Sequence, residues 1–81
     1  MIQNLNTTGM KLSNATVSQW YRIRGLDGPE GECSRLLDLG FTPGEPVAVV
    51  RATPLGDPLI VVVRGSQLAL RKREAAWIEV E

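Results

Sequence analysis

The stretch RLLDLGFTPGEPVAVVRATPLGDPLIVVVRG, residues 35–65, most constrains what this chain can fold into. It holds, in order, a short helical pattern, a glycine, a proline–glycine pair and two runs rich in β-branched residues. The helical spacing of apolar residues starts at Cys33, and Gly40 is expected to end the helix because glycine adopts positive φ readily. Pro43 and Gly44 predict a tight turn. The stretch therefore predicts a helix followed at once by two strands.

The strand pattern extends beyond this stretch. Residues 47–53 and 59–64 are expected to pair antiparallel across the loop TPLGDP, and further short strands are predicted at 17–24, 67–71 and 77–80. About five antiparallel strands, with one short helix between the first two, predict a mainly β fold of the small SH3-like barrel type. Residues 1–14 show neither a helical nor a strand period, which predicts a flexible N-terminal tail before a domain at 15–81.

Composition limits the classes of function. The 81 residues fit one small domain, and the single cysteine allows no disulfide within the chain, which favours a reducing, cytoplasmic setting. Nine Lys and Arg balance nine Asp and Glu, so nucleic acid is not an expected partner. The longest apolar runs have five residues, far short of the roughly 20 that span a bilayer, so direct membrane insertion is not expected.

Residues for catalysis or tight metal binding are scarce. The chain has no histidine, and no carboxylate, lysine or tyrosine is placed by sequence beside a plausible nucleophile, so neither an enzyme nor a cofactor is expected. Asp27, Glu30 and Glu32 cluster within six residues, where hard oxygen ligands could hold a divalent ion weakly, but their spacing matches no defined calcium loop and a solvated acidic loop is the preferred interpretation. Cys33 is interpreted as a small buried apolar residue.

Apolar side chains whose strand phase points them outward give the sharper clue. Along 59–64, Arg64 must face water, so alternation places Ile60 and Val62 on the same outer face. Trp20 alternates with the arginines of the first strand and is expected on the outside. Trp77 shares a face with a glutamate of the last strand, so it is expected to lie outside as well. Because the first and last strands of such a barrel are neighbours, Trp20 and Trp77 are predicted to lie close together.

The candidate partner-binding residues are Trp20, Ile60, Val62 and Trp77. An exposed aromatic of about 150–250 Å² leaves a few kcal/mol for association at roughly 25 cal/mol per Å². The alternative is that each tryptophan lies flat over neighbouring side chains. Weak self-association through Ile60 and Val62 is a further hypothesis.

Several motifs resemble the FeoA family of small bacterial ferrous-iron transport proteins, over about residues 17–80. The most specific are the helix–turn residues, the GDP at 56–58 and the LALR at 68–71; the helix–turn residues are Arg35, Leu36, Leu39, Gly40, Pro43 and Gly44. Gly40 and Gly44 serve backbone geometry, and Leu36 and Leu39 are expected to pack the helix on the barrel. The resemblance implies an SH3-like fold and a non-catalytic, cytosolic accessory role in ferrous iron uptake, docked on the cytosolic part of the FeoB transporter. The alternative is a metal-responsive module similar to the SH3-like domain of iron-dependent repressors.

Overall fold

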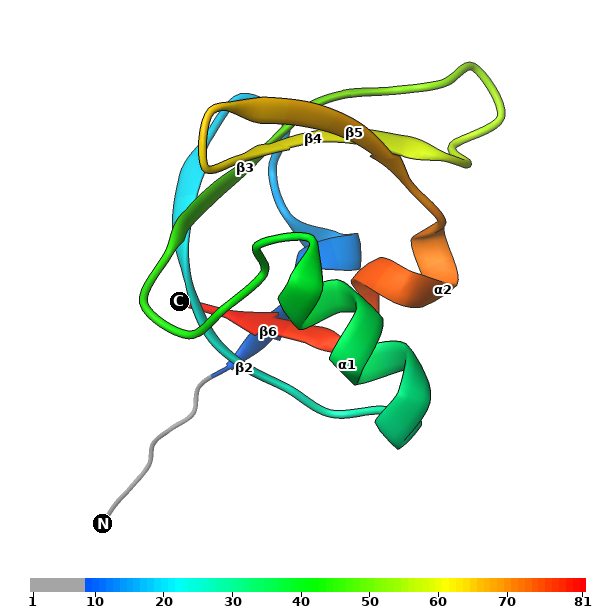
Figure 1. Ribbon diagram of the computed structural model, residues 1–81. Helices are drawn as coiled ribbons and strands as arrows, with labels where there is room; N and C mark the ends of the chain where they lie inside the picture. Colours follow the sequence, from blue (N-terminus) through cyan, green and yellow to red (C-terminus); the bar gives the residue numbers. More distant parts are fainter. Residues whose placement is uncertain (1–8) are drawn as a thin grey trace, which may run out of the picture.

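The computed structural model describes residues 9–81, and its main feature is a six-stranded, wholly antiparallel sheet that curls around one core (Figure 1). The strands are β1 (Met10–Lys11), β2 (Trp20–Leu26), β3 (Pro46–Ala52), β4 (Leu59–Val63), β5 (Ser66–Leu70) and β6 (Ile78–Val80). Their order across the sheet is β1-β6-β2-β3-β4-β5. The helices are a 3₁₀ turn, η2 (Leu12–Asn14), α1 (Glu30–Asp38) and α2 (Lys72–Ala75). The mainly β fold, with α1 after the first long strand, is confirmed.

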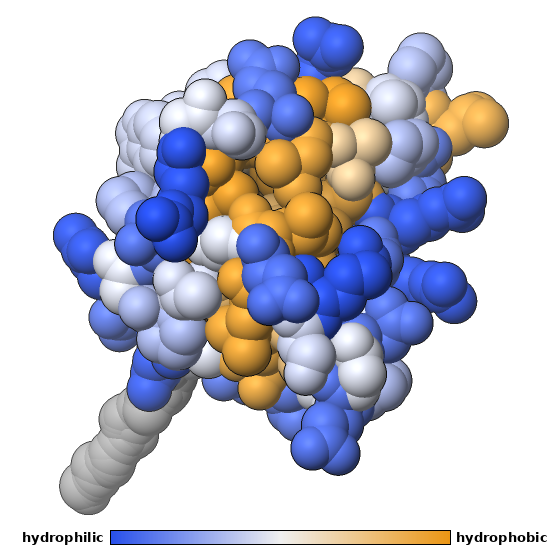
Figure 2. Space-filling view, viewed as in Figure 1, coloured by the Kyte–Doolittle hydropathy of each residue, from blue (hydrophilic) through white to orange (hydrophobic). Residues whose placement is uncertain are grey.

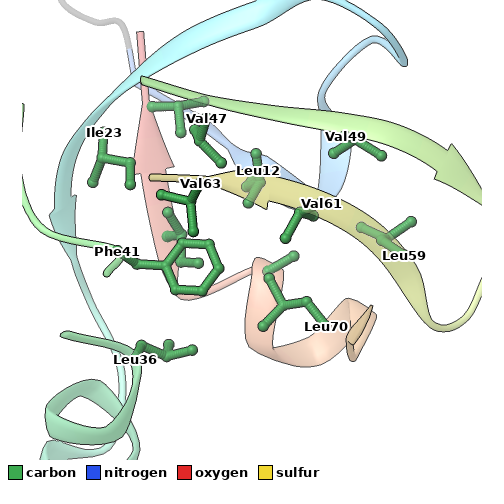
Figure 3. Packing of buried hydrophobic residues seen from close by; sticks show 13 residues of the cluster. Leu12, Ile23, Leu36, Phe41, Val47, Val49, Leu59, Val61, Val63 and Leu70 are labelled. Atoms are coloured by element: carbon green, nitrogen blue, oxygen red, sulfur yellow. The ribbon is translucent and has the colours of Figure 1, made fainter. Parts of the chain in front are cut away.

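The core lies inside the curl of the sheet and is almost wholly aliphatic (Figure 3). On β4, Leu59, Val61 and Val63 are buried while the residues between them are not, as the predicted alternation requires. Phe41 and Leu36 close the lower end of the core in Figure 3. One layer of Val, Leu and Ile side chains thus holds the sheet and both short helices together.

The end of α1 shows why its sequence stops a helix. Gly40 has φ of 111°, its N–H donates to the Leu37 carbonyl (N···O 3.0 Å), and the Phe41 N–H donates to the Leu36 carbonyl (N···O 3.0 Å). These two bonds make up the Schellman termination, and burial of Phe41 supplies its apolar contact. The predicted helix end at Gly40 is therefore confirmed.

Two tight turns set the register of the sheet. The N–H of Glu45 donates to the Thr42 carbonyl across Pro43 and Gly44 (N···O 3.1 Å), with Gly44 at φ of 95°, as the proline–glycine pair predicts. Between β4 and β5 the two loop residues, Arg64 and Gly65, have φ of 53° and 79°. This is the geometry of a type I′ hairpin, whose twist matches that of the strands.

Residues 10–14 differ from the predicted tail. β1 pairs with β6 in the register Met10↔Val80 and Lys11↔Glu79, and Lys11 Nζ lies 3.1 Å from the Glu79 carboxylate. Leu12 has no exposed surface and belongs to the core. The prediction of a tail is wrong for these residues, because a five-residue segment is too short to show a period and is ordered by contacts with distant residues. The rest of the predicted tail, 1–8, lies outside the described residues.

Glu74 joins the two helices. One of its carboxylate oxygens accepts a hydrogen bond from the backbone N–H of Arg71 at the start of α2 (N···O 2.9 Å), and the other pairs with the Arg35 guanidinium on α1. Only 13% of the Glu74 side chain is exposed. One carboxylate thus caps α2 and links α1 to it.

In residues 9–81, no helix has the length and apolar character needed to cross a membrane.

Candidate partner-binding surface

The outer face of the sheet carries a row of residues that begins at Trp20 on β2 and ends on β5. The strand registers align Trp20 with Ala48, Ala48 with Val62 and Val62 with Gln67. Residues directly opposite each other on neighbouring strands share a face, so all four point outward. Trp20 is 61% exposed, which confirms its predicted outward position.

Ala48 shows how this outer face is packed. It points away from the core, between the inward-facing Val47 and Val49, yet only 3% of its surface is exposed. Its cross-strand neighbours are Trp20 on one side and Val62 on the other. We infer that these two neighbouring side chains cover Ala48, which also accounts for the part of Trp20 that is not exposed.

Ile60 and Val62 lie on the predicted outer face but are half-buried rather than fully exposed. β4 is flanked by β3 and β5, which align Ile60 with Arg51 and Ala69. Cross-strand neighbours on both sides reduce the exposure of a central strand. The structure thus brings Trp20, Val62 and Ile60 onto one face, with a smaller exposed apolar area than the sequence predicts.

Trp77 does not join that face. It lies before β6, its N–H donates to the Glu74 carbonyl (N···O 3.0 Å), and its own carbonyl accepts from the Asp27 N–H (N···O 2.8 Å). It is half-buried against the core, and its ring lies under Gly28, where a Cβ atom would be 2.5 Å from the Trp77 Cγ atom. The prediction of an outward Trp77 is wrong, since strand alternation was extended to a residue that belongs to a turn.

The two tryptophans are also far apart. Trp20 begins β2 and pairs with β3, whereas Trp77 lies beside Asp27, beyond the other end of β2. Seven residues of strand correspond to roughly 20 Å. The prediction that the first long strand and the last strand are neighbours is confirmed, since β2 pairs with β6. The prediction that Trp20 and Trp77 lie close together is wrong.

Sequence reasoning missed four exposed apolar side chains, and the first of them is Val17, which is 46% exposed. Leu37 and Leu39 on and after α1 are 40% and 43% exposed, although Leu39 was expected to pack on the barrel together with Leu36. Figure 2 shows apolar surface between β5 and α1. Leu55, at the tip of the loop between β3 and β4, is 94% exposed. The one feature of the sequence that indicates this exposure of Leu55 is its position between the Pro and the Gly of a turn sequence.

The acidic residues that follow β2 do not assemble into a metal centre. No group of three His, Cys, Asp or Glu side chains in residues 9–81 could hold a metal ion. Glu32 instead lies 3.6 Å from the Arg35 guanidinium, one turn further along α1. Asp27 and Glu30 are exposed, and Cys33 is half-buried rather than fully buried as predicted. Glu30 and Glu32 belong to the first turn of α1 and only Asp27 precedes the helix, so these carboxylates do not form one acidic loop.

The curled antiparallel sheet, its single core and its exposed outer row define the class of this molecule as a small SH3-like domain. The chain belongs to the FeoA family, because the model of the FeoA domain matches residues 10–81. Its membership makes it a non-catalytic accessory domain.

Three relatives illustrate the family. The chain is 40% identical over 72 residues to the Fe(2+) transport protein A/Fe(2+) transporter FeoB fusion protein of Porphyromonas gingivalis, covering 89% of this chain and 8% of the fusion protein. The solution structure of iron(II) transport protein A from Clostridium thermocellum is 40% identical with a TM-score of 0.84, over 89% of this chain and 44% of that one. The zinc-complexed FeoA of Stenotrophomonas maltophilia, described as an SH3 domain protein, is 32% identical with a TM-score of 0.79, over 89% of each chain.

Proposed function

We propose that this protein is an accessory of ferrous iron uptake that docks on the cytosolic part of a FeoB-type transporter. The fusion protein of Porphyromonas gingivalis is the observation that carries the proposal. There, a segment 40% identical to this chain shares one polypeptide with a FeoB transporter. Joining two modules in one chain raises the effective concentration of one near the other. The same pair is therefore expected to associate when the two are separate molecules.

The outer row on the sheet is the proposed contact. Trp20 has the exposure and the aromatic character typical of an interface anchor. Burying about 150 Å² of its ring would contribute about 4 kcal/mol at roughly 25 cal/mol per Å². Val62 and Ile60 extend the apolar area beside it. Trp77 is left out of the contact, because its ring is held beneath Gly28.

Docking affects iron uptake only if the domain binds one state of the transporter more tightly than another. A ligand shifts an equilibrium by its difference in affinity for the two states, and equal affinity shifts nothing. The metal-responsive alternative gains no support in residues 9–81, where no metal-holding cluster forms.

The test is a binding titration with the purified cytosolic GTP-binding region of a FeoB-type transporter from the same organism. Trp20→Ala is expected to weaken binding at least 30-fold, which corresponds to the 2 kcal/mol or more of an interface anchor. Leu55→Ala is the matched control, since Leu55 is also exposed and apolar but lies on a loop away from the outer row. If Leu55→Ala weakened binding and Trp20→Ala did not, the outer row would be excluded as the contact.

A further inference from the structure

The outer edge of β5 is an unused backbone surface. β5 is the last strand of the sheet and pairs with β4 alone. The type I′ hairpin makes Val63 and Ser66 a hydrogen-bonded pair, so Leu68 and Leu70 also bond toward β4. The alternate residues, Gln67 and Ala69, must direct their N–H and C=O groups away from β4. These groups have no hydrogen-bond partner among residues 9–81.

Side-chain burial agrees that this edge is open. Leu68 points toward the inside of the sheet, yet it is half-buried, whereas its cross-strand partner Val61 has no exposed surface. The difference arises because no further strand covers β5 on its outer side. Figure 2 shows apolar surface continuing from this edge toward α1, where Leu37 and Leu39 are exposed. A strand added at the edge would therefore lay every second side chain on apolar surface.

Cations lie at both ends of β5. Arg64 precedes the strand, while Arg71, Lys72 and Arg73 follow it, and all four side chains are exposed. None of them forms an ion pair within residues 9–81. The nearby carboxylates are engaged: Glu74 pairs with an arginine of α1, and the Asp57 Oδ1 atom accepts from the backbone N–H of Lys72 (N···O 3.0 Å). The chain has no net charge, so this concentration of positive charge is local.

The charge decides which occupant fits. A second copy of this chain paired through β5 would place its own four cations against these four, and such like-charge contacts oppose association. An extended segment with carboxylates near its ends would instead form complementary pairs with Arg64 and with the cations after β5. We propose that the outer edge of β5 binds, as an added strand, an extended acidic segment of another protein that carries apolar side chains at alternate positions.

The test is an NMR titration of the isotope-labelled full chain with short peptides. The probe is a blocked seven-residue peptide that alternates valine and glutamate, added to about 5 mM because a short added strand is expected to bind with a Kd of about 1 mM. It is expected to shift the amide signals of Gln67 and Ala69 and to slow their hydrogen exchange. The same peptide with lysine in place of glutamate is expected to bind at least tenfold more weakly.

Two controls separate backbone pairing from charge attraction. Methylating the peptide nitrogens that face β5 removes its donors and is expected to weaken binding at least tenfold. Ala69→Pro removes one outward N–H of the chain, which an edge strand tolerates, and is expected to weaken binding similarly. The methylated peptide needs no change to the protein, so it decides the matter if Ala69→Pro does not fold.

The outcomes are clear-cut. Equal binding of the methylated peptide, shifts confined to the surroundings of Trp20, or no shift at 5 mM would each overturn the proposal. A short DNA oligonucleotide that moved the Gln67 and Ala69 signals as strongly as the acidic peptide would also overturn it, since it would show that the cations alone select the ligand. None of these results bears on transporter docking through the outer row, which the titration with the GTP-binding region tests by itself.

Discussion

Replacing Gly28 by alanine is expected to destabilise the protein through one contact. The new Cβ atom would lie 2.5, 2.8 and 2.9 Å from the Cγ, Cδ1 and Cδ2 atoms of Trp77. Carbon atoms pack at about 3.5–4.0 Å, so the ring must move by roughly 1 Å. Its backbone cannot follow freely, because the Trp77 carbonyl accepts the Asp27 N–H and its N–H donates to Glu74.

The magnitude follows from overpacking. Extra atoms in a well-packed site cost about 1–3 kcal/mol, and loss of the Asp27–Trp77 hydrogen bond would add about 1 kcal/mol. We therefore expect Gly28→Ala to lower the free energy of unfolding by about 2–4 kcal/mol. With a urea dependence of about 1 kcal/mol per M, the unfolding midpoint should fall by about 2–4 M.

The assay is urea unfolding followed by circular dichroism, with tryptophan fluorescence in a Trp20→Phe background as the local readout. Gly31→Ala is the matched control, because a Cβ atom there meets nothing within 4 Å and the residue lies in α1. It is expected to raise stability by about 0.5 kcal/mol, since glycine weakens a helix. If Gly28→Ala were as stable as the original chain, the steric argument would be refuted.

Three further predictions concern stability, each read from urea unfolding. Leu12→Ala is expected to cost about 2–5 kcal/mol, because Leu12 is fully buried; no loss would restore the tail prediction. Gly40→Ala should lower the free energy of unfolding more than Gly44→Ala does. Both glycines have positive φ, but only at Gly40 would the new Cβ atom meet a side chain, that of Arg64 at 2.9 Å. Equal losses for the two variants would contradict this prediction. Glu74→Gln should cost about 1 kcal/mol and speed amide exchange in α1, while unchanged exchange would show that α1 does not depend on this charge.

Local backbone chemistry made much of the fold predictable. Gly40 followed by Phe41 specifies the helix end, and Pro43–Gly44 specifies the turn, because each depends on residues only a few positions apart. The alternation along 59–63 likewise gives the buried face of β4. Such features need no knowledge of distant contacts, which is why they were found from the sequence.

The parts that were missed depend on distant contacts. Leu12 is buried because its segment packs against β6 and α2, which lie some sixty to seventy residues further along the chain. Trp77 is covered by Gly28, and neither residue signals the other in the sequence. Arg64 adopts positive φ because the paired strands fix the register of the hairpin, and not because arginine prefers that conformation. Of the candidate surface, Trp20, Ile60 and Val62 were placed correctly on the outer face by alternation, but Ile60 and Val62 are less exposed than expected.

The burial of Ala48 on the outward side of the sheet changes what a surface substitution means here. Trp20 and Val62 flank a residue that is 97% shielded, so the outer row acts as a second apolar layer one side chain deep. A charged replacement of Trp20, made to improve solubility, would uncover this layer and loosen the pairing of β2 with β3. Position 48 itself should accept only small residues, because a larger side chain would lift the tryptophan off the sheet. The proposed docking contact and the fold therefore depend on the same few atoms on this side of the barrel.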